Sequence, residues 1–173
     1  LWIFGWDRLS KKVHLATIWI AATGTLLSAY FILAANSFMQ NPVGYRYNPV
    51  TGRAELTDFA AVLTNKVALV TFPHTIAGAF ITAGGLVLGI ALWNLLRHSD
   101  RDADSFRTAA RAGAATVVVA AALLAITGDR QAKVMTEVQP MKMAAAEALY
   151  ETKDGASFSI FSIGTPDGSE ETF

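Results

Sequence analysis

Long runs of apolar residues, separated by short polar and charged segments, dominate the pattern of this chain. One run covers residues 13–36 and a second covers residues 67–96, and neither contains a formal charge. A third run, rich in alanine and valine, covers residues 112–128 and is extended toward the N-terminus to residue 108. An apolar run of about 20 residues can cross a bilayer as a helix. The pattern therefore predicts three transmembrane helices, over about 13–36, 67–96 and 108–128.

The segments between these runs predict how the helices connect. Basic residues cluster before the first helix and between the second and third, and in short loops they favour the cytoplasmic side. The connection over 37–66 and everything after residue 128 are then expected on the opposite side. Within that connection, residues 57–66 predict a short helix with Thr57 or Asp58 as its N-cap. The basic clusters are Arg8, Lys11 and Lys12, then Arg97, Arg101, Arg107 and Arg111.

The composition changes at Asp129. Residues 130–152 are polar and carry a helical pattern, after which Ser, Gly, Thr and Asp dominate. We therefore expect a transmembrane helical region at 1–128 and the start of an extracytoplasmic loop at 129–173. The predicted fold class is all-α integral membrane, with three transmembrane helices of a larger helical bundle plus a partly helical extracytoplasmic loop. The helical pattern of the loop runs through Met141, Ala144, Ala145 and Leu149.

Composition and charge support a membrane protein. Apolar residues make up 53% of the chain and charged residues 16%, and the formal net charge is zero. A neutral chain does not favour a nucleic-acid partner. The chain contains no cysteine, so neither disulfides nor thiolate metal sites can form within it. The first residue is Leu1 and the last run is acidic, which predicts a piece of a longer protein.

One histidine, His74, lies inside the second apolar run. A titratable side chain within a membrane span is costly, so its presence suggests a function. Neutral imidazole is a common axial ligand of haem iron. The alternative is a histidine that hydrogen-bonds within the bundle or lies at the headgroup level. The other two histidines are weaker candidates for a haem ligand. His14 is expected at the membrane interface and His98 in a solvated basic loop.

Four motifs distributed along the chain resemble one family. They are FGWDRL at 4–9, NSFMQNP at 36–42, FPHT at 72–75 and QPMKMAAAE at 139–147. In order and spacing the chain resembles subunit I of the cytochrome bd quinol oxidases, from its fourth membrane helix to the first part of its quinol-binding loop. The resemblance implies a terminal oxidase of the bacterial cytoplasmic membrane, which oxidises quinol at the outer side and reduces dioxygen to water.

The same resemblance implies cofactors and partners. A low-spin haem b would be bound in part by this piece, and a second haem b and a haem d would lie in the complete subunit. The implied partners are the remainder of subunit I, a second membrane subunit, quinol and the lipid bilayer. A non-redox membrane transporter or assembly subunit is the competing class. A dihaem cytochrome b anchor would need paired histidines on facing helices, and only His74 lies suitably within a span.

Individual residues take roles from the resemblance. His74 matches the axial ligand of the low-spin haem b iron, and Lys142 and Glu147 match the quinol site. Ser28 matches a serine on a proton route from the cytoplasm, and Ile32 lies near the dioxygen path.

The same positions have plainer interpretations. Lys142 and Glu147 are five residues apart and suit a solvated amphipathic helix. Ser28 could bond the carbonyl of Gly24. Asp129 is expected at the outer interface near the low-spin haem, or as a simple helix-end charge.

Overall fold

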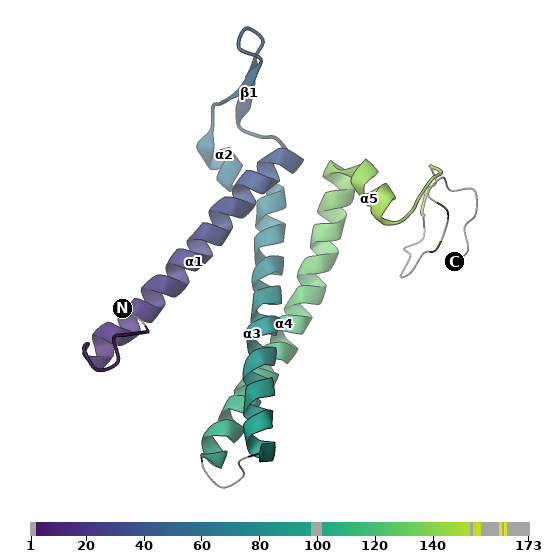
Figure 1. Ribbon diagram of the computed structural model, residues 1–173. Helices are drawn as coiled ribbons and strands as arrows, with labels where there is room; N and C mark the ends of the chain where they lie inside the picture. Colours follow the sequence, from purple (N-terminus) through teal and green to yellow (C-terminus); the bar gives the residue numbers. More distant parts are fainter. Residues whose placement is uncertain (1–2, 98–101, 153, 157–162, 164, 166–173) are drawn as a thin grey trace.

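The computed structural model describes residues 3–97, 102–152, 154–156, 163 and 165. Three long helices make up most of it, and two short helices and one hairpin lie near one end of them (Figure 1). The long helices are α1 (Lys11–Gln40), α3 (Lys66–Arg97) and α4 (Ala103–Val138). The short helices are α2 (Phe59–Leu63) and α5 (Pro140–Ala146), and the hairpin pairs β1 (Tyr45–Asn48) with β2 (Arg53–Leu56).

The three predicted transmembrane helices are confirmed. Within the described residues, three helical segments are long and apolar enough to cross a membrane, at Lys11–Gln40, Phe59–Arg97 and Ala103–Val138. The helices α1, α3 and α4 contain 30, 32 and 36 residues. At about 1.5 Å per residue each exceeds the hydrocarbon thickness of a bilayer. Their ends must therefore reach into the headgroup regions or beyond.

The apolar surface of these helices faces outward. In their most apolar windows only 6%, 17% and 11% of the residues are buried. Exposed side chains such as Ile20 and Leu86 are 72% and 64% accessible. In water this surface would be unfavourable, but lipid and neighbouring helices can cover it. The predicted class, a helical membrane protein whose spans belong to a larger bundle, fits this exposure.

Helices α3 and α4 form the main packed pair, whereas α1 contacts α3 near one end and leans away from it (Figure 1). Glycines allow the close approach of α3 and α4. A Cβ added at Gly113 would lie 2.8 Å from the Gly84 carbonyl oxygen and 2.9 Å from the Leu88 nitrogen. Small residues at such crossings let helix backbones pack closely in membranes.

The connection after α1 differs from the all-α prediction because it contains a β-hairpin. Arg46 faces Glu55 across the two strands. The Asn48 side chain starts the turn by accepting hydrogen bonds from the Val50 and Thr51 nitrogens, at 2.9 and 3.3 Å. Asn-Pro dipeptides predict turns, but a four-residue strand has too short a pattern to be recognised. The short helix that follows is confirmed as α2, with Asp58 as its cap.

Beyond residue 128 the helical boundaries differ from those predicted. Helix α4 continues without a break through Asp129 and ends at Val138, and the helical pattern over 130–152 is divided between two helices. The break lies at Gln139, with φ −139° and ψ 59°. Pro140 explains it, because proline disfavours the helical conformation of the preceding residue. Ala148, with a φ of 52°, follows the end of α5 and leaves Leu149 outside the helix.

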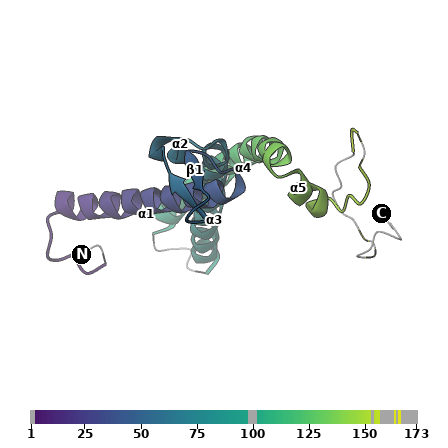
Figure 2. The same cartoon turned by 90° about the horizontal axis from the view of Figure 1, so that it is seen from above.

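The elements divide between two ends of the molecule. The C-terminal end of α1, the hairpin, the start of α3 and the α4–α5 corner lie at one end, as the prediction of sidedness requires (Figure 1). Seen from above, α1 and α5 extend in opposite directions from the central α3–α4 pair (Figure 2).

Candidate functional site

His74 projects from α3 toward α4 and is half-buried in their interface. Its Nδ1 lies 3.1 Å from the Thr127 hydroxyl oxygen. The same hydroxyl lies 2.7 Å from the Leu123 carbonyl oxygen and 3.3 Å from that of Leu124. The imidazole therefore has a defined neighbour on the facing helix at one of its two ring nitrogens.

The hydrogen-bond pattern around Thr127 selects the tautomer of the imidazole. A hydroxyl has one proton to donate, and the short bond to the Leu123 carbonyl takes it. The Thr127 oxygen is then left to accept from His74, so Nδ1 carries the proton. In a neutral ring this leaves the lone pair on Nε2, which makes no hydrogen bond to any described residue. A protonated Nδ1 with a free Nε2 is the arrangement that a metal-ligating histidine uses.

Gly128 provides the space for this ring. A Cβ built at Gly128 would lie 3.3 Å from His74 Cε1 and 3.7 Å from Nδ1. The glycine therefore lets α4 approach the imidazole closely. His74 thus fits the chemistry of an axial haem ligand, because a ring held through Nδ1 can present Nε2 as a nitrogen donor.

An apolar groove of about 640 Å³ lies between α3 and α4. Its lining begins at Phe72 and Pro73, just before His74, and continues through Phe80, Val119 and Leu123. Such a surface can cover a flat apolar group or a neighbouring helix. The lining is almost wholly apolar, and His74 follows its first two residues in the chain.

Lys142 and Glu147 come from different parts of the α4–α5 corner. Lys142 lies within α5, and its Nζ is 3.4 Å from the Gln40 side-chain oxygen at the end of α1. Glu147 is the C-cap of α5, and its backbone N–H bonds the carbonyl of Met143 at 3.0 Å. Because α5 ends at Ala146, Glu147 lies just outside it. The angle between two side chains five residues apart on a regular helix therefore does not describe this pair.

The predicted path residues lie on α1. Ser28 is exposed, and among the described residues no hydrogen bond to the Gly24 carbonyl is present, so that simple interpretation is not supported. Ile32 is 66% exposed. Both side chains face the surroundings of this piece and not its α3–α4 interface.

Other residues singled out in the sequence have clear surroundings. Asp129 is not at a helix end, because α4 continues past it, and its carboxylate pairs with Lys133 at 2.8 Å. His14 is 8% exposed and its ring lies 4.6 Å from that of Trp6. His98 lies outside the described residues.

The structure adds residues that sequence reasoning did not single out. Thr127 and Gly128 surround the His74 ring, and Gln40 and Gln139 join α1 to the α4–α5 corner. No periodic pattern identifies a threonine or glycine opposite a histidine. Gln40 and Gln139 do lie inside two of the quoted motifs, so the motifs contained a signal that side-chain chemistry alone did not explain.

Comparisons of sequence and of structure with known proteins all identify one protein family. The family model described as cytochrome bd terminal oxidase subunit I matches residues 1–173. Cytochrome bd ubiquinol oxidase subunit 1 of Bacillus subtilis (strain 168) is 41% identical over 162 residues, which cover 93% of this chain and 34% of that protein. Cytochrome bd-II ubiquinol oxidase subunit 1 of Escherichia coli (strain K12) is 36% identical over 155 residues, which cover 88% of this chain and 29% of that protein.

The solved structure of bd oxidase from Geobacillus thermodenitrificans superposes with a TM-score of 0.83 and 28% identity, covering 99% of this chain and 39% of the matched chain. The chain thus spans about a third of the length of the curated relatives named above. Because the family model matches along the whole sequence, the chain belongs to the cytochrome bd terminal oxidase subunit I family.

Proposed function

We propose that this chain is part of a respiratory terminal oxidase that oxidises quinol and reduces dioxygen to water. The observation that carries the proposal is the family match over residues 1–173. The competing class, a non-redox transporter or assembly subunit, has no support from that match. As in its bacterial relatives, the protein belongs in a bacterial membrane, and we assign it to the cytoplasmic membrane, with α1, α3 and α4 as spans.

In this proposal His74 is an axial ligand of the low-spin haem b. The support is its position in a span, its Nδ1 bond to Thr127 and the resulting lone pair on Nε2. When bound, the haem supplies one-electron transfer. The chain's own contribution is to present Nε2 in a fixed direction, with Gly128 giving the ring room and α3 and α4 excluding water from one side of it.

Lys142 and Glu147 are proposed to act at the quinol site. Quinol oxidation releases two electrons and two protons, so a group that accepts protons from the ring hydroxyls is needed. A carboxylate such as Glu147 can accept a hydrogen bond and then a proton. The Lys142 ammonium can donate to a ring oxygen, and its exposed position in the first turn of α5 leaves it accessible to a ligand.

The remaining assignments concern the complete protein. A second haem b, a haem d, the remainder of subunit I and a second membrane subunit complete the oxidase in this proposal. Ser28 would lie on a proton route from the cytoplasm and Ile32 near the dioxygen path. Their exposure on α1 suits this idea, because another part of the subunit can then line the other side of each path.

Replacing His74 tests the haem assignment. In the complete oxidase purified from membranes, His74→Ala should abolish the low-spin haem b band of the reduced-minus-oxidised spectrum, because a low-spin iron needs two strong axial ligands. His14→Ala is the matched control and should keep that band. A His74→Ala enzyme with an unchanged spectrum would rule out the ligand role.

Replacing Glu147 tests the quinol site separately. Glu147→Gln keeps the size of the side chain but removes the proton acceptor. We expect quinol-driven oxygen uptake to fall at least tenfold while all haem bands remain, since general-base catalysis contributes about 10²–10⁴-fold. Glu151→Gln, a nearby exposed carboxylate outside α5, is the control. Full turnover by the Glu147→Gln enzyme would exclude a catalytic carboxylate at this position.

A further inference from the structure

The end of α1 meets the α4–α5 corner through two side-chain hydrogen bonds, both involving Gln40. The Gln139 side-chain nitrogen donates to the Gln40 backbone oxygen at 2.6 Å, and the Lys142 ammonium donates to the Gln40 side-chain oxygen at 3.4 Å. These two bonds join segments about a hundred residues apart in the chain. Gln40 therefore contacts both the residue at the helix break and a residue proposed for the quinol site.

The Gln40 amide has a defined orientation. Its nitrogen donates to the Asn36 side-chain oxygen one turn earlier on α1, at 2.5 Å. The amide oxygen is consequently the atom turned toward Lys142. This oxygen is a neutral acceptor, so it can hold the ammonium without neutralising its charge. A carboxylate in the same place would neutralise it.

The Gln139 bond fixes the corner on which α5 is built. Gln139 is both the C-cap of α4 and the N-cap of α5, and its side chain makes no capping bond to α5. It bonds instead to Gln40, whose carbonyl is one of the last four of α1 and has no partner within the helix. The α1 terminus and the start of α5 therefore satisfy each other's polar groups.

We propose that Gln40 is a positioning residue for the quinol site: it sets the direction of α5 through Gln139 and holds the Lys142 ammonium, still charged, toward a quinol ring oxygen. The inference rests on the proposed role of Lys142 at that site. Gln40 need not touch the quinol, because its effect passes through Lys142. Removing its side-chain oxygen should thus weaken quinol binding and leave haem chemistry unchanged.

The test uses the complete oxidase and measures oxygen uptake against quinol concentration, normalised to haem b absorbance. Gln40→Met keeps the length of the side chain but has no amide oxygen, and we expect the KM for quinol to rise about two- to fivefold with kcat nearly constant, as suits an exposed contact. Met39→Ala is the matched control, because Met39 is 71% exposed at the same turn of α1. Its KM should remain that of the native enzyme.

A double-mutant cycle tests whether Gln40 acts on quinol binding through Lys142. In a Lys142→Ala background, Gln40→Met should change KM no further, because the group it positions is already absent. A full additional increase would overturn the inference, and so would an unchanged KM in Gln40→Met alone. If Lys142→Ala itself leaves KM unchanged, the quinol-site proposal fails and this inference with it. The two failures are therefore distinguishable.

A charged variant provides a second test if the Gln40→Met oxidase fails to assemble and lacks its haem bands. Gln40→Glu retains an acceptor at the same distance but pairs with the Lys142 charge. We expect a raised KM at low ionic strength that returns toward the native value as salt screens the new pair. A native KM at every salt concentration would contradict the role of Gln40.

Discussion

At the scale of single residues, Thr127 determines which nitrogen of His74 can bind a metal. Its hydroxyl proton is used by the Leu123 carbonyl, so its oxygen accepts from Nδ1. An acceptor at Nδ1 raises the donor strength of the opposite nitrogen toward a metal. The threonine thus links an ordinary backbone-directed hydrogen bond within α4 to the electronic properties of His74, the proposed haem ligand on α3.

If His74 is the proposed ligand, replacing Thr127 with valine should raise the midpoint potential of the low-spin haem b. Valine has the same shape but no acceptor, so His74 becomes a weaker donor and stabilises the oxidised iron less. We expect a rise of tens of millivolts, since about 59 mV corresponds to a tenfold change in a one-electron equilibrium. Redox titration of the haem band measures it, with the band itself retained.

Two further variants make this result specific. Thr127→Ser keeps the oxygen and should restore the native potential. Thr136→Val removes a hydroxyl that makes the same kind of bond within α4, to the Ala132 carbonyl, and should leave the potential unchanged. A native potential in Thr127→Val would contradict the hydrogen bond to His74.

The sequence singled out some residues of the proposed sites and not others for a physical reason. His74 is conspicuous because a titratable group in an apolar run is costly, and Lys142 and Glu147 lie in a specific motif. Thr127 and Gly128 have no such signal, because threonine and glycine are ordinary in membrane helices. Their importance comes from facing His74 across the α3–α4 interface, which is a tertiary relation.

At the scale of elements, hydrophobic pattern predicted the three spans, but it did not give the end of the helix that contains the third. The apolar run ends near Gly128, yet the backbone of α4 has no reason to break until Pro140. Hydropathy reports the depth of a segment in a membrane, whereas capping residues and proline determine where a helix ends. The hairpin was missed because its short strands carry polar as well as apolar residues.

The α3–α4 crossing depends on glycine at the point of contact. Gly113→Ala would place a methyl group 2.8 Å from the Gly84 carbonyl oxygen, and that oxygen is backbone and can move only with its helix. We expect a loss of about 1–3 kcal/mol, as for other overpacked sites. The measurement is the temperature at which the purified oxidase loses its low-spin haem b band.

The control for this substitution is Gly85→Ala. A Cβ at Gly85 meets no atom within 4 Å, so the alanine adds helix propensity without a clash. The thermal midpoint should be equal to or above that of the native enzyme. Equal losses in the two variants would argue against close packing at Gly113.

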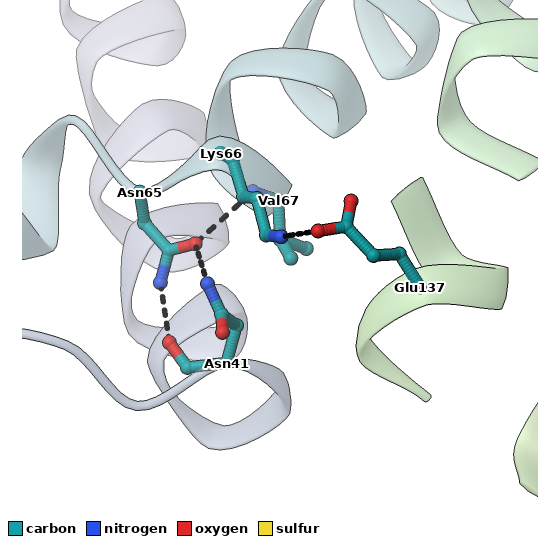
Figure 3. Close-up of polar contacts among 5 residues, drawn as sticks. All are labelled: Asn41, Asn65, Lys66, Val67 and Glu137. Atoms are coloured by element: carbon teal, nitrogen blue, oxygen red, sulfur yellow. Dashed lines mark hydrogen bonds and ion pairs between the residues drawn. The ribbon is translucent and has the colours of Figure 1, made fainter. Parts of the chain in front are cut away.

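At the scale of the whole molecule, the three spans are joined at one end by polar side chains. The Asn65 side chain caps α3 by accepting from the Val67 nitrogen at 3.0 Å and donates to the Asn41 carbonyl at the end of α1, at 2.8 Å (Figure 3). Next to it, Lys66 of α3 pairs with Glu137 of α4 at 2.6 Å. Since α1 leans away from α3 elsewhere, this end sets its direction.

The Asn65 hydrogen bonds and the Lys66–Glu137 ion pair should contribute unequally to stability. Asn65 is 2% exposed, so Asn65→Ala leaves the Asn41 carbonyl and the Val67 nitrogen without their partner in a buried place, at a cost of about 1–3 kcal/mol. The side chains of Lys66 and Glu137 are 43% and 66% exposed, and such ion pairs contribute only about 0–1 kcal/mol. Thermal loss of the haem band should therefore occur at a clearly lower temperature in Asn65→Ala than in Glu137→Gln.

The control is Asn94→Ala, which removes a bond to the Ile90 carbonyl within α3 and should behave like the native enzyme. If Glu137→Gln proved the more damaging change, the ion pair and not the buried amide would hold α1, α3 and α4 together.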